Sequence, residues 1–200
     1  RSTPYEDPQV FDGENDLILA LEKYDKGGQN EAYYDFDRED WWNCKACNAG
    51  DLGEKGFRPG EYVDVGYTNK NNVDNCYKNL GYIVNGEWVK YTIDVKHAGV
   101  YEFELYACNH IDYNIVAVSV DGENALVNDK EGTDETVRAF YLDQCNGGTT
   151  DGGYDDWGWV KPVASPEAAS KFSNAKFYIN FKKPGEQVLG LAFLTSNSGL

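Results

Sequence analysis

The chain has 200 residues, of which 41% are hydrophobic and 14% aromatic, a composition that excludes a disordered chain. It predicts one ordinary domain, long enough to bury a real core. The formal net charge of −16 creates a field that repels phosphate backbones and anionic membranes, so neither a nucleic acid nor a membrane is expected as a partner.

Residues 1–14 are polar and interrupted by Pro and Gly, so they are expected to form a tail or linker before a single module at 15–200. Short segments separated by turn residues then predict strands at 17–24, 32–36, 62–65, 88–95, 100–108, 115–120, 136–142, 177–181 and 188–194. No segment keeps a 3.6-residue period, and 165–171 forms at most a short helix. These patterns predict an all-β fold, a β-sandwich or barrel.

Two long inserts interrupt this series of strands, one at 37–58 with Trp41 and Trp42 and one at 144–173 with Tyr154 and Trp157. Loops of this length in a compact domain are typically functional or disordered, and their aromatic content argues against disorder. Trp41 and Trp42 either extend a binding surface or fill their loop, and the second alternative is slightly favoured.

The cysteine pattern indicates an extracytoplasmic protein. The chain has no Met and five cysteines: Cys44, Cys47, Cys76, Cys108 and Cys145. The odd number leaves at least one thiol unpaired or intermolecular. Cys44 and Cys47 have the gap of a zinc knuckle, but no second such pair follows, so disulfides are favoured over structural zinc. The chain opens Arg1-Ser2-Thr3-Pro4, which is typical of a mature or excised start, and a secreted or cell-surface location is expected.

The most informative stretch is 81–95, where a Gly-rich aromatic loop lies directly before a strand that alternates with period two. Aromatic rings that loops present on a rigid β scaffold suit the binding of sugar rings, because axial C–H bonds stack on an aromatic face. No residue of this stretch is an obvious nucleophile or proton shuttle. The stretch therefore favours recognition over catalysis.

Six motifs, in this order, resemble the family 6 carbohydrate-binding modules. They are ALEKYDKGGQNEAYYD (20–35), FRPGEYVDV (57–65), GYIVNGEWVKYTIDV (81–95), AGVY (98–101), GGYDDW (152–157) and PGEQVL (184–189). The resemblance implies a β-jelly-roll module without catalysis of its own, joined in a larger chain to a glycoside hydrolase that it holds on a polysaccharide. Its main site lies in loops at one end of the sandwich, where two aromatic rings grip a sugar, and a second site can occur on the concave sheet face.

The resemblance also implies site residues. Tyr82 matches one jaw of the aromatic clamp, and Tyr154 matches the other, where the family more often has Trp. Asn85 and Glu87 lie in the right loop to supply polar contacts. Trp157 either contacts the ligand or anchors its loop by packing inwards. Trp88 begins a strand and is expected in the core.

The family commonly holds a structural calcium ion with carboxylates of its first strand. Glu22 matches one of these positions, whereas Ala20 stands where a second carboxylate is usual, so backbone carbonyls and water would have to complete the ligand set. The family's binding Asn normally follows a segment like 195–200, where this chain stops. Asn197 is near the site but is not the matching residue.

The resulting hypothesis is a carbohydrate-binding module for a β-linked polysaccharide, such as a β-glucan, xylan or agar-type galactan. A protein-binding or adhesion jelly roll is the first alternative, because the same loops would serve a protein partner. A glycoside hydrolase is the second. It needs two facing carboxylates, and with 34 Asp and Glu some pairs arise by coincidence, so Glu61 with Asp64 or Asp155 with Asp156 is no evidence for it.

Overall fold

The computed structural model describes residues 1–36, 58, 60–67, 78–81, 83–107, 114–127, 131–132, 139–142, 158–160, 162–163 and 177–194. Within these residues the regular structure is β-strand, apart from one 3-10 turn, η1 (Leu21–Lys23). The prediction of an all-β sandwich is confirmed. None of the described helical structure is long and apolar enough to cross a membrane.

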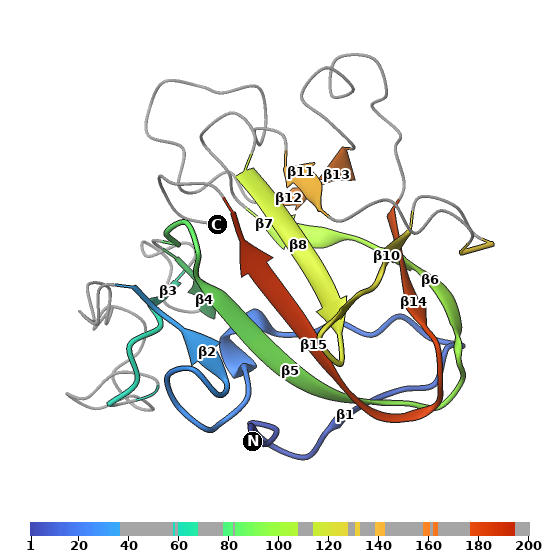
Figure 1. The fold of residues 1–200 in the computed structure, drawn as a ribbon, viewed down its shortest axis with the longest axis horizontal. Coiled ribbons are helices and arrows are strands. Elements are labelled where there is room, and N and C mark those ends of the chain that lie inside the picture. Colours follow the sequence, from blue (N-terminus) through green and yellow to red (C-terminus); the bar gives the residue numbers. More distant parts are fainter. Residues whose placement is uncertain are drawn as a thin grey trace.

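One large sheet forms the first layer (Figure 1). Its described strands are, in spatial order, β1 (Gln9–Phe11), β5 (Trp88–Val95), β15 (Gly185–Phe193), β8 (Asn114–Val120), β11 (Phe140–Leu142) and β13 (Pro162–Val163), with β2 (Tyr33–Tyr34) on β5 and β9 (Glu123–Asn124) on β8. β15 pairs antiparallel with β5 on one side and with β8 on the other. The last described strand of the chain is therefore central in this sheet.

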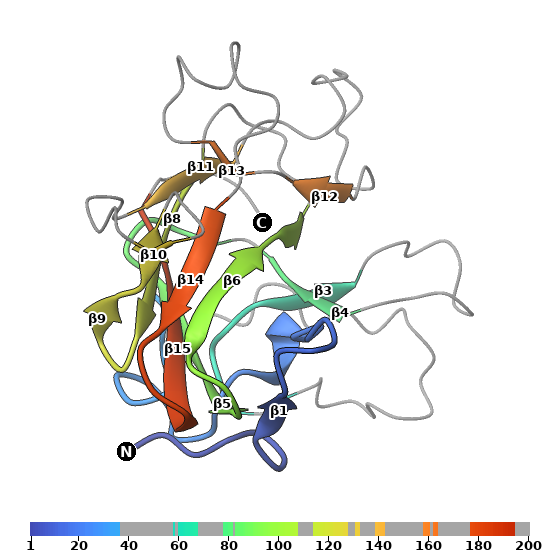
Figure 2. The same ribbon diagram turned by 90° about the vertical axis from the view of Figure 1, so that its right-hand side faces the viewer.

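A smaller sheet forms the second layer and lies over the first sheet (Figure 2). It consists of β10 (Leu126–Val127), β14 (Phe177–Phe181) and β6 (Gly99–Phe103). Two short pairs flank it, β7 (Leu105–Ala107) with β12 (Gly158–Val160) and β3 (Val65–Tyr67) with β4 (Lys78–Leu80). The two layers enclose one apolar core.

β5 shows why this sequence forms a sandwich strand. Val89, Tyr91, Ile93 and Val95 are buried, and the residues between them are half-buried, so the period of two puts one face on the core. Trp88 is one of these half-buried residues. The expectation that Trp88 lies in the core is wrong: its ring lies on the outer face, with the Lys90 ammonium 4.7 Å from the ring centroid.

The predicted strand at 17–24 is also wrong. Leu17, Leu19 and Leu21 alternate along this segment and do pack against the core. This alternation is the reason that the sequence predicts a strand here. The segment has no ladder partner, however, because the free edge of β5 is already taken by β2 at Trp88–Val89 and by β1 at Ile93–Val95. The Tyr91 hydroxyl donates to the Leu21 carbonyl at 2.8 Å and so ties the segment to β5, while η1 packs beside β4.

The expectation of a tail at 1–14 is corrected by β1. Gln9–Phe11 pairs in parallel with β5, and Thr3 exchanges two backbone hydrogen bonds with Lys26. The Phe11 ring packs edge-on against Tyr101, with 4.6 Å between centroids, and also lies 6.1 Å from the Phe181 ring in the second layer. This polar, Pro-containing segment carries one apolar anchor, and that anchor joins the two sheets.

Other predicted strands agree with the structure to different extents. The bounds of β5 and β14 are those predicted, and β8 and β15 differ by one and by three residues at their starts. The predicted strand 100–108 is divided at Glu104 into β6 and β7. The insert at 144–173 contains two short strands, β12 and β13, which pair with β7 and β11. The predicted helix at 165–171 lies outside the described residues.

The Arg58 side chain is buried against the ring of Tyr24. The Arg58 side chain is 5% exposed, and its guanidinium carbon lies 3.5 Å from the centroid of the Tyr24 ring. Its nitrogens donate to the backbone carbonyls of Tyr24 and Asp25, and Nη2 lies 2.8 Å from a carboxylate oxygen of Glu61. Burial raises the pKa of Tyr24 far above its ordinary value, although the nearby guanidinium acts against that shift. The Tyr24 phenol is therefore neutral, and Arg58 pairs with Glu61.

Candidate functional site

Several strand ends meet at one end of the sandwich. Trp88 at the start of β5 is opposite Ala192 of β15, and Phe193 is opposite Val116 near the start of β8. Next to them, Leu142 at the end of β11 is opposite Asn114. The segments that precede Trp88 and follow Leu142 therefore leave the main sheet at the same end, which we call the loop end (Figure 1).

The second layer reaches this same end. β5 and β6 are joined by a short turn at the opposite end, so β6 and then β7 run toward the loop end. Ala107 at the end of β7 is opposite Gly158 at the start of β12. Residues 143–157, which contain Tyr154 and Trp157, thus connect two strand ends that both lie at the loop end.

The width of the loop end follows from the sheet. From β5 to β11 there are three strand spacings of about 4.8 Å, so these two strands are roughly 14 Å apart across the sheet, and Leu142 lies three residues beyond the level of Trp88. Tyr82, Tyr154 and Trp157 themselves lie outside the described residues, and their roles stay predictions. Trp41, Trp42 and the five cysteines are also outside the described ranges.

The loop before β5 is closed by a tight turn over residues 84–87. Glu87 N–H donates to the Val84 carbonyl at 3.2 Å, and Gly86 has a φ of +97°. A positive φ at the third position of such a turn requires glycine in most cases, which explains the Asn85-Gly86 pair in the sequence. Asn85 is exposed at the tip of this turn. Its predicted contact with a ligand stays a prediction.

Glu87, by contrast, is a buried carboxylate, 8% exposed. Its Oε2 accepts a hydrogen bond from Val84 N–H at 2.7 Å, and its Oε1 accepts one from Phe36 N–H at 3.1 Å. The observed contacts of Glu87 hold backbone, and direct contact with a ligand stays a prediction. The sequence holds a signal for this orientation, because the period of two in β5 puts residue 87 on the same inward face as Val89.

The backbone around Glu87 is held by the end of β15. Gly86 N–H donates to the Phe193 carbonyl at 2.7 Å, and Phe193 N–H donates to the Glu87 carbonyl at 2.9 Å. On the other flank of the loop, Gly81 N–H donates to the Asp64 carbonyl at 2.9 Å, and Ile83 is buried. The described residues on both sides of position 82 are therefore fixed to the sandwich.

The calcium position predicted at Glu22 lies in the 3-10 turn η1 and not in a strand. Among the described residues no group of three or more His, Cys, Asp or Glu side chains could hold a metal ion. Calcium takes six to eight oxygen ligands, so the described side chains do not fit it by themselves. A calcium ion at Glu22 stays a proposal that needs backbone carbonyls and water.

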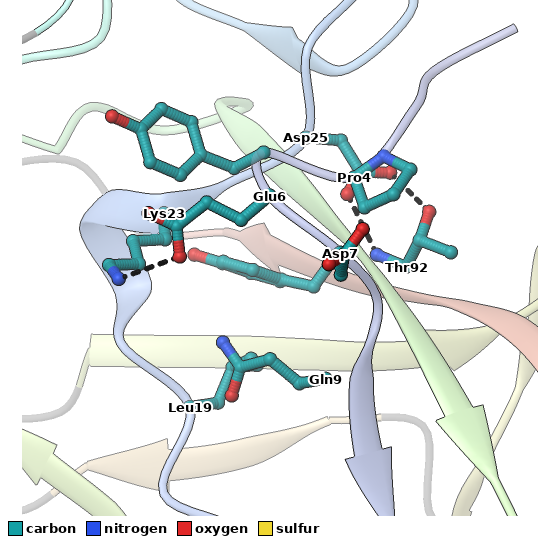
Figure 3. Close-up of a pocket in the computed structure, with 10 residues that line it drawn as sticks. Pro4, Glu6, Asp7, Gln9, Leu19, Lys23, Asp25 and Thr92 are labelled. Atoms are coloured by element: carbon teal, nitrogen blue, oxygen red, sulfur yellow. Dashed lines mark hydrogen bonds and ion pairs between the residues drawn. The ribbon is translucent and has the colours of Figure 1, made fainter.

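A small cavity lies elsewhere, between the N-terminal segment and β5 (Figure 3). Lys23 and Glu6 form an ion pair of 3.1 Å at its edge, and the Asp25 carboxylate accepts hydrogen bonds from Thr92 N–H and Oγ1–H at 2.8 and 2.7 Å. Its volume of about 20 Å³ gives space for one water molecule but not for a sugar ring. The loop end remains the candidate site.

Comparisons with known proteins return structures but no sequence relatives: no family model matches the chain, and no curated protein matches it. A β-1,3-glucan-binding CBM6 from Bacillus halodurans is similar, with 15% identity and a TM-score of 0.43 over 68% of this chain and 78% of that one. A second structure, of a family 6 carbohydrate-binding module whose binding sub-sites were dissected, has 14% identity and a TM-score of 0.41 over 73% and 82%. Both are of the family that the sequence motifs resemble. Likeness at this level fixes neither ligand nor site.

Proposed function

We propose that the chain is a non-catalytic carbohydrate-binding module that anchors a glycoside hydrolase to a β-linked polysaccharide. The ligand would be a β-glucan, a xylan or an agar-type galactan, held by aromatic stacking at the loop end. An extracellular or cell-surface location and a parent hydrolase in a larger chain belong to the same proposal.

One observation carries the proposal beyond the sequence motifs. The start of β5, which follows the Tyr82 segment, and the two strand ends that flank the Tyr154 segment lie at the same end of the sandwich, although these segments are about seventy residues apart. Two aromatic side chains from separate loops on a rigid sheet are what a sugar clamp requires. The formal charge of −16 favours a neutral ligand over an anionic one.

Calorimetric titration with a soluble β-glucan, a soluble xylan and an agar-type oligosaccharide tests the function. Heat with one of them is expected, and Tyr82→Ala is expected to weaken that binding by at least roughly tenfold, because aromatic residues dominate such sites. Ile18→Ala, at a 75% exposed apolar residue of the N-terminal segment, is the matched control and should bind as the wild type does. An absence of heat with all three ligands contradicts the proposal.

The same preparation separates binding from hydrolysis. In the described residues Glu61 is paired with Arg58, and Asp64 is buried, so this acidic pair does not face a cleft together. A glycosidase needs two carboxylates on either side of the scissile bond. Release of reducing sugar by the purified protein would overturn the non-catalytic assignment, and glycan-independent capture of a protein would favour an adhesion module.

The calcium proposal has its own measurement, a thermal unfolding scan with and without calcium. Calcium at a hundredfold excess over its dissociation constant would stabilise the fold by roughly 2.7 kcal/mol, which raises Tm by several degrees. Glu22→Gln is expected to abolish the rise, and Glu14→Gln, at an exposed acidic residue, is expected to keep it. An unchanged wild-type Tm excludes a stabilising calcium site.

A further inference from the structure

Glu87 connects two segments that are far apart in the sequence. Its two carboxylate oxygens accept N–H groups of Val84, three residues before it, and of Phe36, 51 residues before it. The first bond closes the turn that follows position 82, and the second holds the chain just after β2. One side chain thus fixes two of the segments that meet at the loop end.

The chain after β2 has a second support of the same kind. The Gln29 side chain donates to the Asp35 carbonyl at 2.6 Å and accepts from Asp35 N–H at 3.1 Å. Gln29 therefore holds residue 35 and Glu87 holds residue 36, both through backbone groups. Phe36 itself is left 66% exposed.

From these contacts we propose that Glu87 is a positioning residue of the loop-end site. It supports binding by holding the Tyr82 loop and the chain after β2 in one arrangement, and it does so without touching the sugar. This inference rests on the proposed function. A loop that is ordered before the ligand arrives binds more tightly, because the ordering entropy is not lost on binding.

The two oxygens of Glu87 give a chemical test. Two N–H donors need two acceptors, and the Gln side chain offers one acceptor and one donor. Glu87→Gln thus keeps the length of the side chain but leaves one N–H facing a donor. Had Glu87 bound a sugar hydroxyl directly, Gln would serve nearly as well, since a hydroxyl both donates and accepts. Glu87→Asp keeps both acceptor oxygens on a side chain that is one methylene shorter. If Glu87→Gln does not fold, this second variant tests whether Glu87 positions the two segments.

The experiment measures affinity and amide exchange together, on the full chain. The probe is whichever of the soluble β-glucan, the soluble xylan and the agar-type oligosaccharide binds the wild type. Glu87→Gln is expected to weaken binding roughly tenfold and to speed hydrogen exchange at the Phe36 or Val84 amide, because an unmet N–H is costly. Asn85→Ala, at the exposed turn tip, is the control for exchange and should leave both amides slow.

Each result decides one point. Wild-type affinity in Glu87→Gln overturns the positioning role, and so does weakened binding with both amides still slow, because the two segments would then be held without the second acceptor. A wild type that binds no probe overturns the proposed function instead, and the exchange rates then still report whether Glu87 holds the two segments.

Discussion

Replacing Arg58 with alanine is expected to destabilise the protein by about 3 kcal/mol or more, measured as a lower urea midpoint at unchanged slope. The change removes the donor for the carbonyls of Tyr24 and Asp25 and leaves Glu61 without its partner in a largely buried place. It also removes the cation from the face of the Tyr24 ring. Breaking a buried pair by removing one partner is costly because the remaining charge stays desolvated.

Two control variants make the Arg58 result specific. Arg58→Lys keeps the charge but not the planar fork that serves three acceptors, so an intermediate loss is expected. Lys182→Ala removes an exposed ion pair with Glu123 and should change stability by less than about 1 kcal/mol. An Arg58→Ala protein as stable as Lys182→Ala would show that the buried guanidinium contributes nothing net.

The second large effect is expected in the N-terminal segment. Phe11→Ala should cost about 2 kcal/mol, because Phe11 packs on Tyr101 and Phe181 across the two sheets. Val10→Ala, at the 55% exposed neighbour on the same strand, should stay within about 0.5 kcal/mol. Thermal or urea unfolding checks both, and equal stabilities for the two variants would restore the view of 1–14 as a tail.

Deleting residues 1–11 should cost at least as much as Phe11→Ala. The deletion also uncovers the edge of β5 at Ile93–Val95, where β1 now pairs. An open edge invites pairing with another chain, so size-exclusion chromatography of the shortened protein is expected to show association. A deleted protein that is monomeric and fully stable contradicts the structural role of β1.

The sequence predicts the fold where a pattern is local. β5 and β14 alternate or run apolar between clear turns, and their bounds follow from that. The segment 17–24 carries the same kind of pattern without becoming a strand, because pairing depends on which edges are free, and β1 and β2 take the edge of β5. Which strand pairs with a given edge depends on the whole sheet, so a short window of sequence does not predict it.

Some features of the candidate site also follow from local sequence patterns. The Asn85-Gly86 turn and the inward face of Glu87 follow from turn chemistry and from the period of two, and the orientation of Trp88 follows from the same period. Outside the candidate site, Arg58 has no such signal. Its partners Tyr24 and Asp25 lie more than thirty residues upstream, and a single Arg beside a Pro gives no sign that its guanidinium is buried.

The central place of β15 has a consequence for the order of folding. β5 and β8 do not pair with each other, since β15 lies between them, and β15 comes about ninety residues after β5 in the chain. The main sheet therefore depends on contacts of high sequence separation, which makes folding slow. During synthesis the turn at 84–87 lacks its Phe193 partner until β15 has emerged. We expect the proposed carbohydrate binding to appear only after β15 has been made, together with the closed sheet.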